Sequence, residues 1–202
     1  MATFQLQIEG YTGTESDTTF LSDKLTDGAK MIIDLLPESK HEKYSVDLAD
    51  AGSGVSITGY RFIKAHKSGY PAMRVDSSMQ TQILDSNSLH YAATKSPVFY
   101  IESGKVYIKP GSGTAVAIAY PTVLYGATSI TNFPPELNHA VVLYGAIQTA
   151  IKKQNEALST LIDETDIELR KAETERQMAI FGKYKAIAEE LNAEFQNIIK
   201  IL

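Results

Sequence analysis

The chain has 202 residues, 44% of them hydrophobic and 21% charged, and a formal net charge of −5, which is typical of one domain with a sizeable core or a compact domain with an extension. Its longest apolar runs are far shorter than the roughly 20 residues that a membrane-spanning helix needs, so the sequence predicts no membrane span. The absence of cysteine excludes disulfides, thiolate nucleophiles and thiolate-rich zinc sites, and the absence of a basic patch gives little electrostatic support to a primary role in binding nucleic acid.

The chain begins with a polar segment and continues into a helical pattern. Residues 1–16 are rich in Gly and Thr, which predicts a mobile leading segment. From Asp17, a candidate N-cap, apolar residues recur at helical spacing as far as Pro37, which cannot continue a helix. The sequence therefore predicts one amphipathic helix over residues 17–36.

Between residues 44 and 120 the apolar period changes to two, and Gly and Pro recur at regular intervals. The candidate strands are residues 44–48, 55–65, 72–75, 98–101, 105–109 and 114–120. Residues 102–104 and 110–113 have the composition and length of hairpin turns. This region is predicted to form an antiparallel meander or a small barrel.

The last third of the sequence is helical in pattern. Pro134 and Pro135 suit a first helical turn, and a broad apolar face predicts a helix over residues 135–155 that is buried on two sides. Beyond it, few residues oppose helix. An unbroken helix to residue 200 would be roughly 100 Å long, whereas a capping box formed by Thr160 and Asp163 would break it and fold it into a hairpin. The pattern does not decide between the two.

These elements predict an α+β fold in which helices pack around the β region. The expected division is a body over residues 1–155 and a long helical C-terminal extension over residues 156–202.

The residues that could carry chemistry favour structural roles. The histidines are scattered, and the glycines at 52–54 and 111–113 have neither the following helix nor the lysine of a phosphate-binding loop. The acidic residues at 163–168 are more simply a solvated helix face than a cation site. We therefore expect no catalytic, cofactor-binding or metal-binding residues, and no enzymatic activity.

An apolar stripe near the C-terminus is the main candidate for partner binding. It follows helical spacing and consists of Ile180, Tyr184, Ile187, Leu191, Phe195 and Ile198. The stripe either packs on the chain's own body or docks into a groove on another subunit, because an exposed stripe of this size would promote aggregation. If it docks on a partner, deletion of residues 178–202 should leave a folded body that no longer binds that partner.

Several segments resemble virion structural proteins of tailed bacteriophages. They are residues 4–8, 27–37, 90–100 and 120–123, and residues 132–137 leading into 141–147. The resemblance covers about residues 4–155 and consists of packing and turn motifs. In layout the chain is similar to head-to-tail adaptors, which have helices around a β insertion and a terminal arm.

This resemblance implies a structural subunit of the phage neck, assembled in the host cytoplasm. It implies a ring of subunits, commonly twelve, that contacts the portal protein and a tail or neck protein and passes DNA through its centre without sequence-specific binding. Such a ring needs heterologous contacts that close by rotation. In that setting the C-terminal stripe would dock on the portal or on an adjacent subunit.

Two alternatives stay open. A tail-completion, tail-terminator or head-decoration subunit would have the same composition. A small hydrolase or sugar-binding protein would instead gather some of Asp76, Asp85, His90 and Glu102 in one cleft of the β region.

Overall fold

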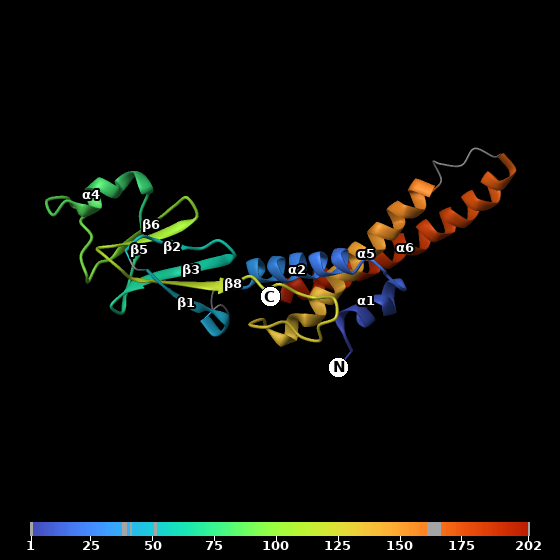
Figure 1. Ribbon diagram of the computed structural model, residues 1–202, viewed down its shortest axis with the longest axis horizontal. Coiled ribbons are helices and arrows are strands. Elements are labelled where there is room, and N and C mark those ends of the chain that lie inside the picture. The colour runs from blue at the N-terminus through green and yellow to red at the C-terminus, as the bar shows by residue number, and fades with distance from the viewer. Residues whose placement is uncertain (1, 38–39, 41, 51, 161–166, 202) are drawn as a thin grey trace. The chain divides into compact units, whose positions relative to one another are not determined.

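Helices from both ends of the chain form one compact unit, and the strands between them form another (Figure 1). The computed structural model describes residues 2–37, 40, 42–50, 52–160 and 167–201. The helical unit comprises residues 1–35 and 121–202, and the β unit comprises residues 36–120. The α+β class is thus confirmed. The boundaries differ from the expected division at residue 155, because the C-terminal helix belongs to the helical unit and the strands form an insertion.

The leading segment is helical, and its prediction as a mobile segment was wrong. Helix α1 (Phe4–Thr12) begins at Thr3, whose side chain accepts a hydrogen bond from the backbone N–H of Leu6 at 3.3 Å. Phe4, Ile8 and Thr12 lie four residues apart and are all buried on one face of the helix. The Gly and Thr content of the segment hid this short apolar face from the composition-based prediction.

Helix α2 (Thr18–Leu35) confirms the predicted amphipathic helix. The Asp17 carboxylate caps it by accepting the backbone N–H of Phe20 at 2.9 Å. The apolar positions of the predicted stripe, including Leu21, Leu25 and Ile32, are fully buried.

The segment that returns from the β unit is held to α2 by side chains. The Ser22 hydroxyl accepts the backbone N–H of Tyr125 at 3.2 Å, and the Thr26 hydroxyl accepts that of Val123 at 2.9 Å. Val123 is itself buried. The helical unit is therefore closed by residues that are about 100 positions apart in the chain.

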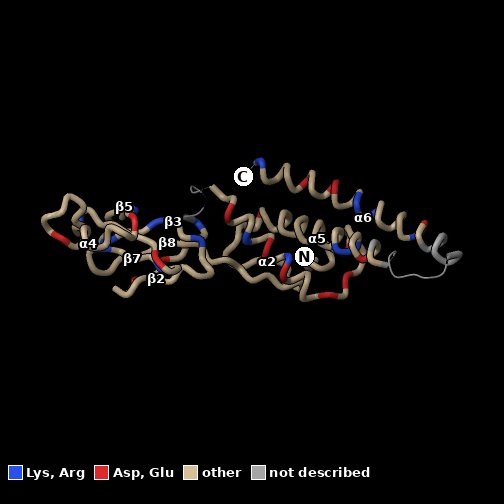
Figure 2. Tube along the Cα trace, turned by 90° about the horizontal axis from the view of Figure 1, so that it is seen from above, with Lys and Arg blue, Asp and Glu red and all other residues tan. Residues whose placement is uncertain are grey.

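Helix α5 (Asn138–Thr160) follows a short 3₁₀ turn, η3 (Pro135–Leu137), and lies between α2 and helix α6 (Ile167–Ile201) (Figure 2). It also contacts α1. Every residue from Ala140 to Ala150 is buried or half-buried, which confirms for this part of the helix the prediction that it is buried on two sides.

Helices α5 and α6 form an antiparallel hairpin that extends past α1 and α2 (Figure 1). A single unbroken helix is therefore excluded. The capping box proposed from Thr160 and Asp163 involves side chains that lie outside the described residues.

The β unit contains two four-stranded sheets. One has the order β1 (Val46–Ala49), β8 (Thr114–Ala119), β3 (Tyr60–Lys67) and β4 (Tyr70–Pro71), and the other has the order β2 (Val55–Ser56), β7 (Lys105–Lys109), β6 (Val98–Glu102) and β5 (Met73–Arg74). A shared core includes Val55, Ala65, Phe99, Val106, Ile108 and Ala115, which come from both sheets. Because β1 pairs with β8, with Val46 opposite Ala117, the insertion begins and ends on neighbouring strands.

The strand pairing is more complex than the predicted meander. The predicted strand 55–65 is two strands, β2 and β3, which belong to different sheets, with a turn that contains Gly59 between them. Residues 110–113 connect β7 to β8 across the two sheets and so do not form a hairpin. Strand β5 pairs with β6 in parallel.

The hairpin between β6 and β7 matches its prediction. Ser103 and Gly104 both have positive φ, at 50° and 72°, as a tight two-residue turn requires. On these strands Tyr100 and Tyr107 stack as a cross-strand pair with ring centroids 5.1 Å apart. The aromatic residues of these two strands therefore serve packing.

Candidate interaction surfaces

The predicted C-terminal stripe lies on α6 and faces α5 within the same chain. Leu191 and Phe195 are buried, and the Phe195 ring lies 6.0 Å from that of Tyr144 on α5. The other four members, Ile180, Tyr184, Ile187 and Ile198, are half-buried. The structure thus accounts for the stripe by packing on the chain's own body, and docking of its half-buried members on a partner stays a prediction.

Two consecutive lysines of α5 hold the connection between α1 and α2. The Lys152 ammonium group lies 3.2 Å from a carboxylate oxygen of Glu15 and 3.3 Å from one of Asp17. The Lys153 ammonium group donates to the carbonyl oxygens of Thr12, Gly13 and Thr14 at 2.7–3.2 Å. Lys153 thereby satisfies carbonyls at the C-terminal end of α1, where the helix dipole favours a cation.

The environment shifts the pKa values of these groups in different directions. The backbone N–H of Phe20, together with Lys152, holds the pKa of Asp17 below its ordinary value. Burial lowers the pKa of Lys152, but its hydrogen bonds to Glu15 and Asp17 outweigh that effect and raise the net value. Burial lowers the pKa of Lys153, whose partners are mainly neutral carbonyls.

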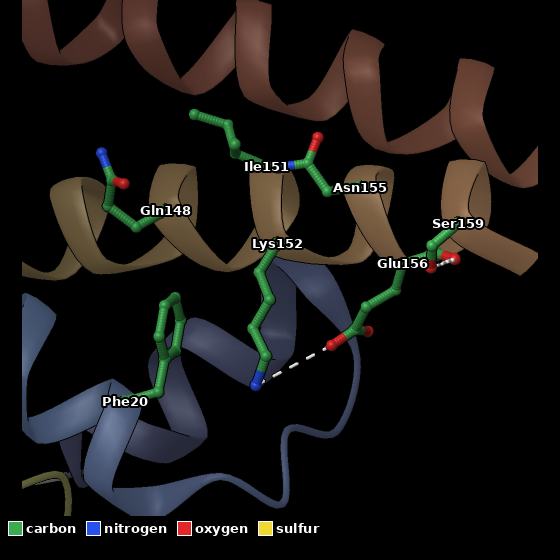
Figure 3. A pocket seen from close by; sticks show the side chains of 7 residues that line it. All are labelled: Phe20, Gln148, Ile151, Lys152, Asn155, Glu156 and Ser159. Carbon is green, nitrogen blue, oxygen red and sulfur yellow. Dashed lines mark hydrogen bonds and ion pairs between the residues drawn. The ribbon is translucent and has the colours of Figure 1, made fainter.

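Two open hollows lie on the helical unit, one on each side of a ridge formed by Gln148 and Ile151 of α5, and Lys152 lines the first of them. The first, of about 520 Å³, lies between α5 and Phe20 of α2 (Figure 3). Its lining is Phe20, Gln148, Ile151, Lys152, Asn155, Glu156 and Ser159. The second, of about 490 Å³, is lined by Ile147, Gln148, Ile151, Gln154, Lys185, Ala188, Glu189 and Asn192. Ile151 keeps 37% of its surface exposed and is thus an apolar side chain between two concave regions.

The β unit carries a projecting apolar loop between β5 and β6. It includes the short helix α4 (Gln80–Leu84), and the backbone N–H of Ala92 donates to the Ile83 carbonyl at 2.9 Å, which closes the loop at its base. Ile83 and Ala92 are buried in a cluster with Val98 and Tyr100. We call the exposed apolar side chains of this loop, Leu84, Leu89 and Tyr91, the apolar tip.

Two local hydrogen bonds shape the turns of the loop that carries the tip. The Asp85 carboxylate accepts the backbone N–H of Asn87 at 2.9 Å, and the Ser88 hydroxyl accepts that of His90 at 3.1 Å. The sequence predicts no element at this feature, because the segment has no helical or strand periodicity. The signal that could have found it is large apolar residues placed among turn-forming residues.

The polar residues considered for a hydrolase or sugar-binding site have separate local roles. Asp76 caps a 3₁₀ turn, η2 (Ser77–Met79). Asp85 and the His90 backbone make hydrogen bonds within the loop that carries the tip, and Glu102 accepts a hydrogen bond from Gln80 at 3.0 Å. Asp76 lines a hollow of about 420 Å³ with Arg74, Val75, Ser77 and Ile101, and none of the other three candidates lines it. Within the described residues, no group of three or more His, Asp or Glu side chains is placed to hold a metal ion.

The glycine turn at 52–54 is already occupied by a carboxylate of the chain. The buried Asp50 accepts the backbone N–H groups of Gly52 and Gly54 at 2.7 and 3.0 Å. These donors are the ones that a phosphate would need. The interpretation of this sequence as a structural turn is therefore supported.

Neither a protein-family model nor a curated protein matches the chain in sequence. Among the described helices, none combines the length and apolar character needed to cross a bilayer.

Proposed function

We propose that the chain is a structural subunit of a tailed-bacteriophage virion, a head-to-tail adaptor that forms an oligomeric ring beneath the portal. The observation that carries this proposal is the layout of the chain: a β unit inserted between α2 and α5 through the neighbouring strands β1 and β8, and a helical unit with a long terminal helix. Adaptors have this combination of helices, β insertion and terminal arm, and the resemblance over residues 4–155 points the same way.

Ring assembly places two requirements on such a subunit. Each copy must present two different surfaces that fit each other, because heterologous contacts close into a ring. The wall of the channel must also not bind DNA tightly, and the net charge of −5 is favourable in that respect because it repels phosphate. The portal and a tail or neck protein would contact the two faces of the ring.

Labelling of the particle tests the neck position. A hexahistidine tag inserted between Ser68 and Gly69 lies in an exposed turn of the β unit and should leave the fold intact. In particles of the phage that encodes the tagged chain, nickel–gold label should appear at the junction of head and tail. The matched control is the untagged particle.

The same images decide between the alternatives. Label at the junction supports the proposal, and ring masses of the purified chain by native mass spectrometry then give the copy number, for which we expect twelve. Label spread over the head surface or confined to another part of the tail overturns the neck position and favours a decoration or tail subunit. Particles without label would overturn a virion role altogether.

A further inference from the structure

We infer that the apolar tip of one copy docks against the ridge and hollows of α5 on the helical unit of a second copy. This inference rests on the proposed oligomeric assembly and names the two surfaces that would make its subunit contact. The tip is defined by Leu84, Leu89 and Tyr91, and its binding site by Ile151 and the two hollows that flank it.

The tip is carried by a loop that is closed at its base. Leu89 is fully exposed although its loop is closed at Ile83 and Ala92 and held by the Asp85 and Ser88 side chains. A loop that its own hydrogen bonds close loses less conformational entropy on binding than an open loop, so the burial of its apolar side chains contributes more to affinity. Tyr91 of the tip is of a residue type that is enriched among the side chains that carry most of the binding energy at protein interfaces.

The opposing surface on the helical unit is concave and combines apolar and polar side chains. The hollows beside Ile151 are open, and together they offer apolar contacts from Phe20, Ile151 and Ala188 within a polar rim. The rim includes Lys152, Glu156, Lys185 and Glu189. An apolar centre with a polar, charged rim is the usual composition of a protein–protein interface.

The opposite net charges of the two units favour a second copy as the partner. The β unit has nine Lys and Arg against seven Asp and Glu, a net charge of +2, whereas the helical unit has ten against seventeen, a net charge of −7. Contact between two helical units would bring like charges together. Contact between the β unit of one copy and the helical unit of the next joins units of opposite net charge and is heterologous, as a closed ring requires.

Cysteine cross-linking tests the contact directly, because the chain has no cysteine of its own. Leu89→Cys and Ile151→Cys variants are mixed and treated with a short bis-maleimide, so that any 89–151 link joins two different copies. Leu124→Cys replaces Ile151→Cys in the control mixture, since Leu124 is also on the helical unit, is 63% exposed and does not line either hollow. The dimer yield should be several-fold higher for the 89–151 mixture, and equal yields would overturn the inference.

Charged substitutions give a second, independent readout by sedimentation. Leu89→Asp and Ile151→Asp should each weaken self-association by at least about 20-fold, the effect of losing one strong interface residue, while Leu124→Asp should not. Leu89→Asp keeps intact hollows and Ile151→Asp keeps an intact tip. An equal mixture of these two variants should therefore form a 1:1 pair and nothing larger, because the pair has only one such contact to make.

The outcomes separate this inference from the proposed function. A wild-type chain that stays monomeric at all concentrations, or variants that assemble as the wild type does, would overturn the contact while gold label at the neck could still support the adaptor role. Tip-dependent assembly with label elsewhere in the particle would support the contact and overturn the neck position.

Discussion

At the scale of single residues, two glycines allow helices of the helical unit to approach closely. An added Cβ at Gly28 of α2 would lie 2.8 Å from the Tyr144 ring, and one at Gly145 of α5 would lie 2.9 Å from Ile8. Both distances are shorter than van der Waals contact. Gly28 therefore serves packing despite the lower helix propensity of glycine.

Gly28→Ala is expected to lower the free energy of unfolding by about 1–3 kcal/mol, because the Tyr144 ring would have to move from its place beside Phe195. Gly10→Ala is the matched control, since Gly10 is also helical but has no neighbouring atom within 4 Å of the added Cβ. That variant should be stabilised by about 0.5–1 kcal/mol. Urea unfolding followed by circular dichroism measures both, and equal effects would contradict the close-packing explanation.

Protonation of Asp17 at acid pH is expected to lower the stability of the helical unit. The folded-state pKa of Asp17 lies below the ordinary value, chiefly because its carboxylate accepts the backbone N–H of Phe20 and next because of Lys152. The contribution of the Asp17 charge to the free energy of unfolding is therefore present above the ordinary aspartate pKa. It is lost as the pH falls through the lowered pKa. Asp17→Asn keeps a capping side chain but removes the charge. The free energy of unfolding of the variant should fall less on acidification than that of the wild type, and parallel pH curves would refute this role.

At the scale of elements, the α5–α6 hairpin changes what is expected of the C-terminal residues. Leu191 and Phe195 contribute to the core of the helical unit, so deletion of residues 178–202 would expose the apolar surface of α5. We therefore expect the deletion to destabilise the helical unit as well as to remove any partner contact of α6. Loss of assembly in that variant alone would not identify a docking site.

Phe195→Ala is expected to cost about 3–5 kcal/mol of stability, as for other buried phenylalanines. Met178→Ala lies on the same helix, but its side chain is 57% exposed, and the substitution should change stability by less than about 0.5 kcal/mol. Thermal and urea unfolding of the two variants test the hairpin packing. A small effect at Phe195 would show that α6 does not pack on α5 through this residue in solution.

At the scale of the whole molecule, the β unit has its own core and begins and ends on paired strands. Its 85 residues are enough for an independent domain. Residues 36–120 expressed alone should give a dispersed amide NMR spectrum and a β-type circular dichroism spectrum. A random-coil spectrum would mean that the β unit depends on the helical unit for its stability.

The sequence by itself determined the α+β class, the helix before Pro37, the helical C-terminal third and the turn at Ser103 and Gly104, because each depends on local periodicity, capping or backbone preference. It also indicated the stripe that includes Leu191 and Phe195, though not what covers it.

Only the tertiary structure decided which surfaces meet. The pairing of β1 with β8, the separation of β2 from β3 into two sheets and the folding back of α6 onto α5 all join residues that are far apart in the chain. The exposure of Leu89 and the hollows beside Ile151 likewise follow from how several elements pack. Such contacts depend on the burial of apolar surface between distant segments, and no local pattern of residues encodes which segments those are.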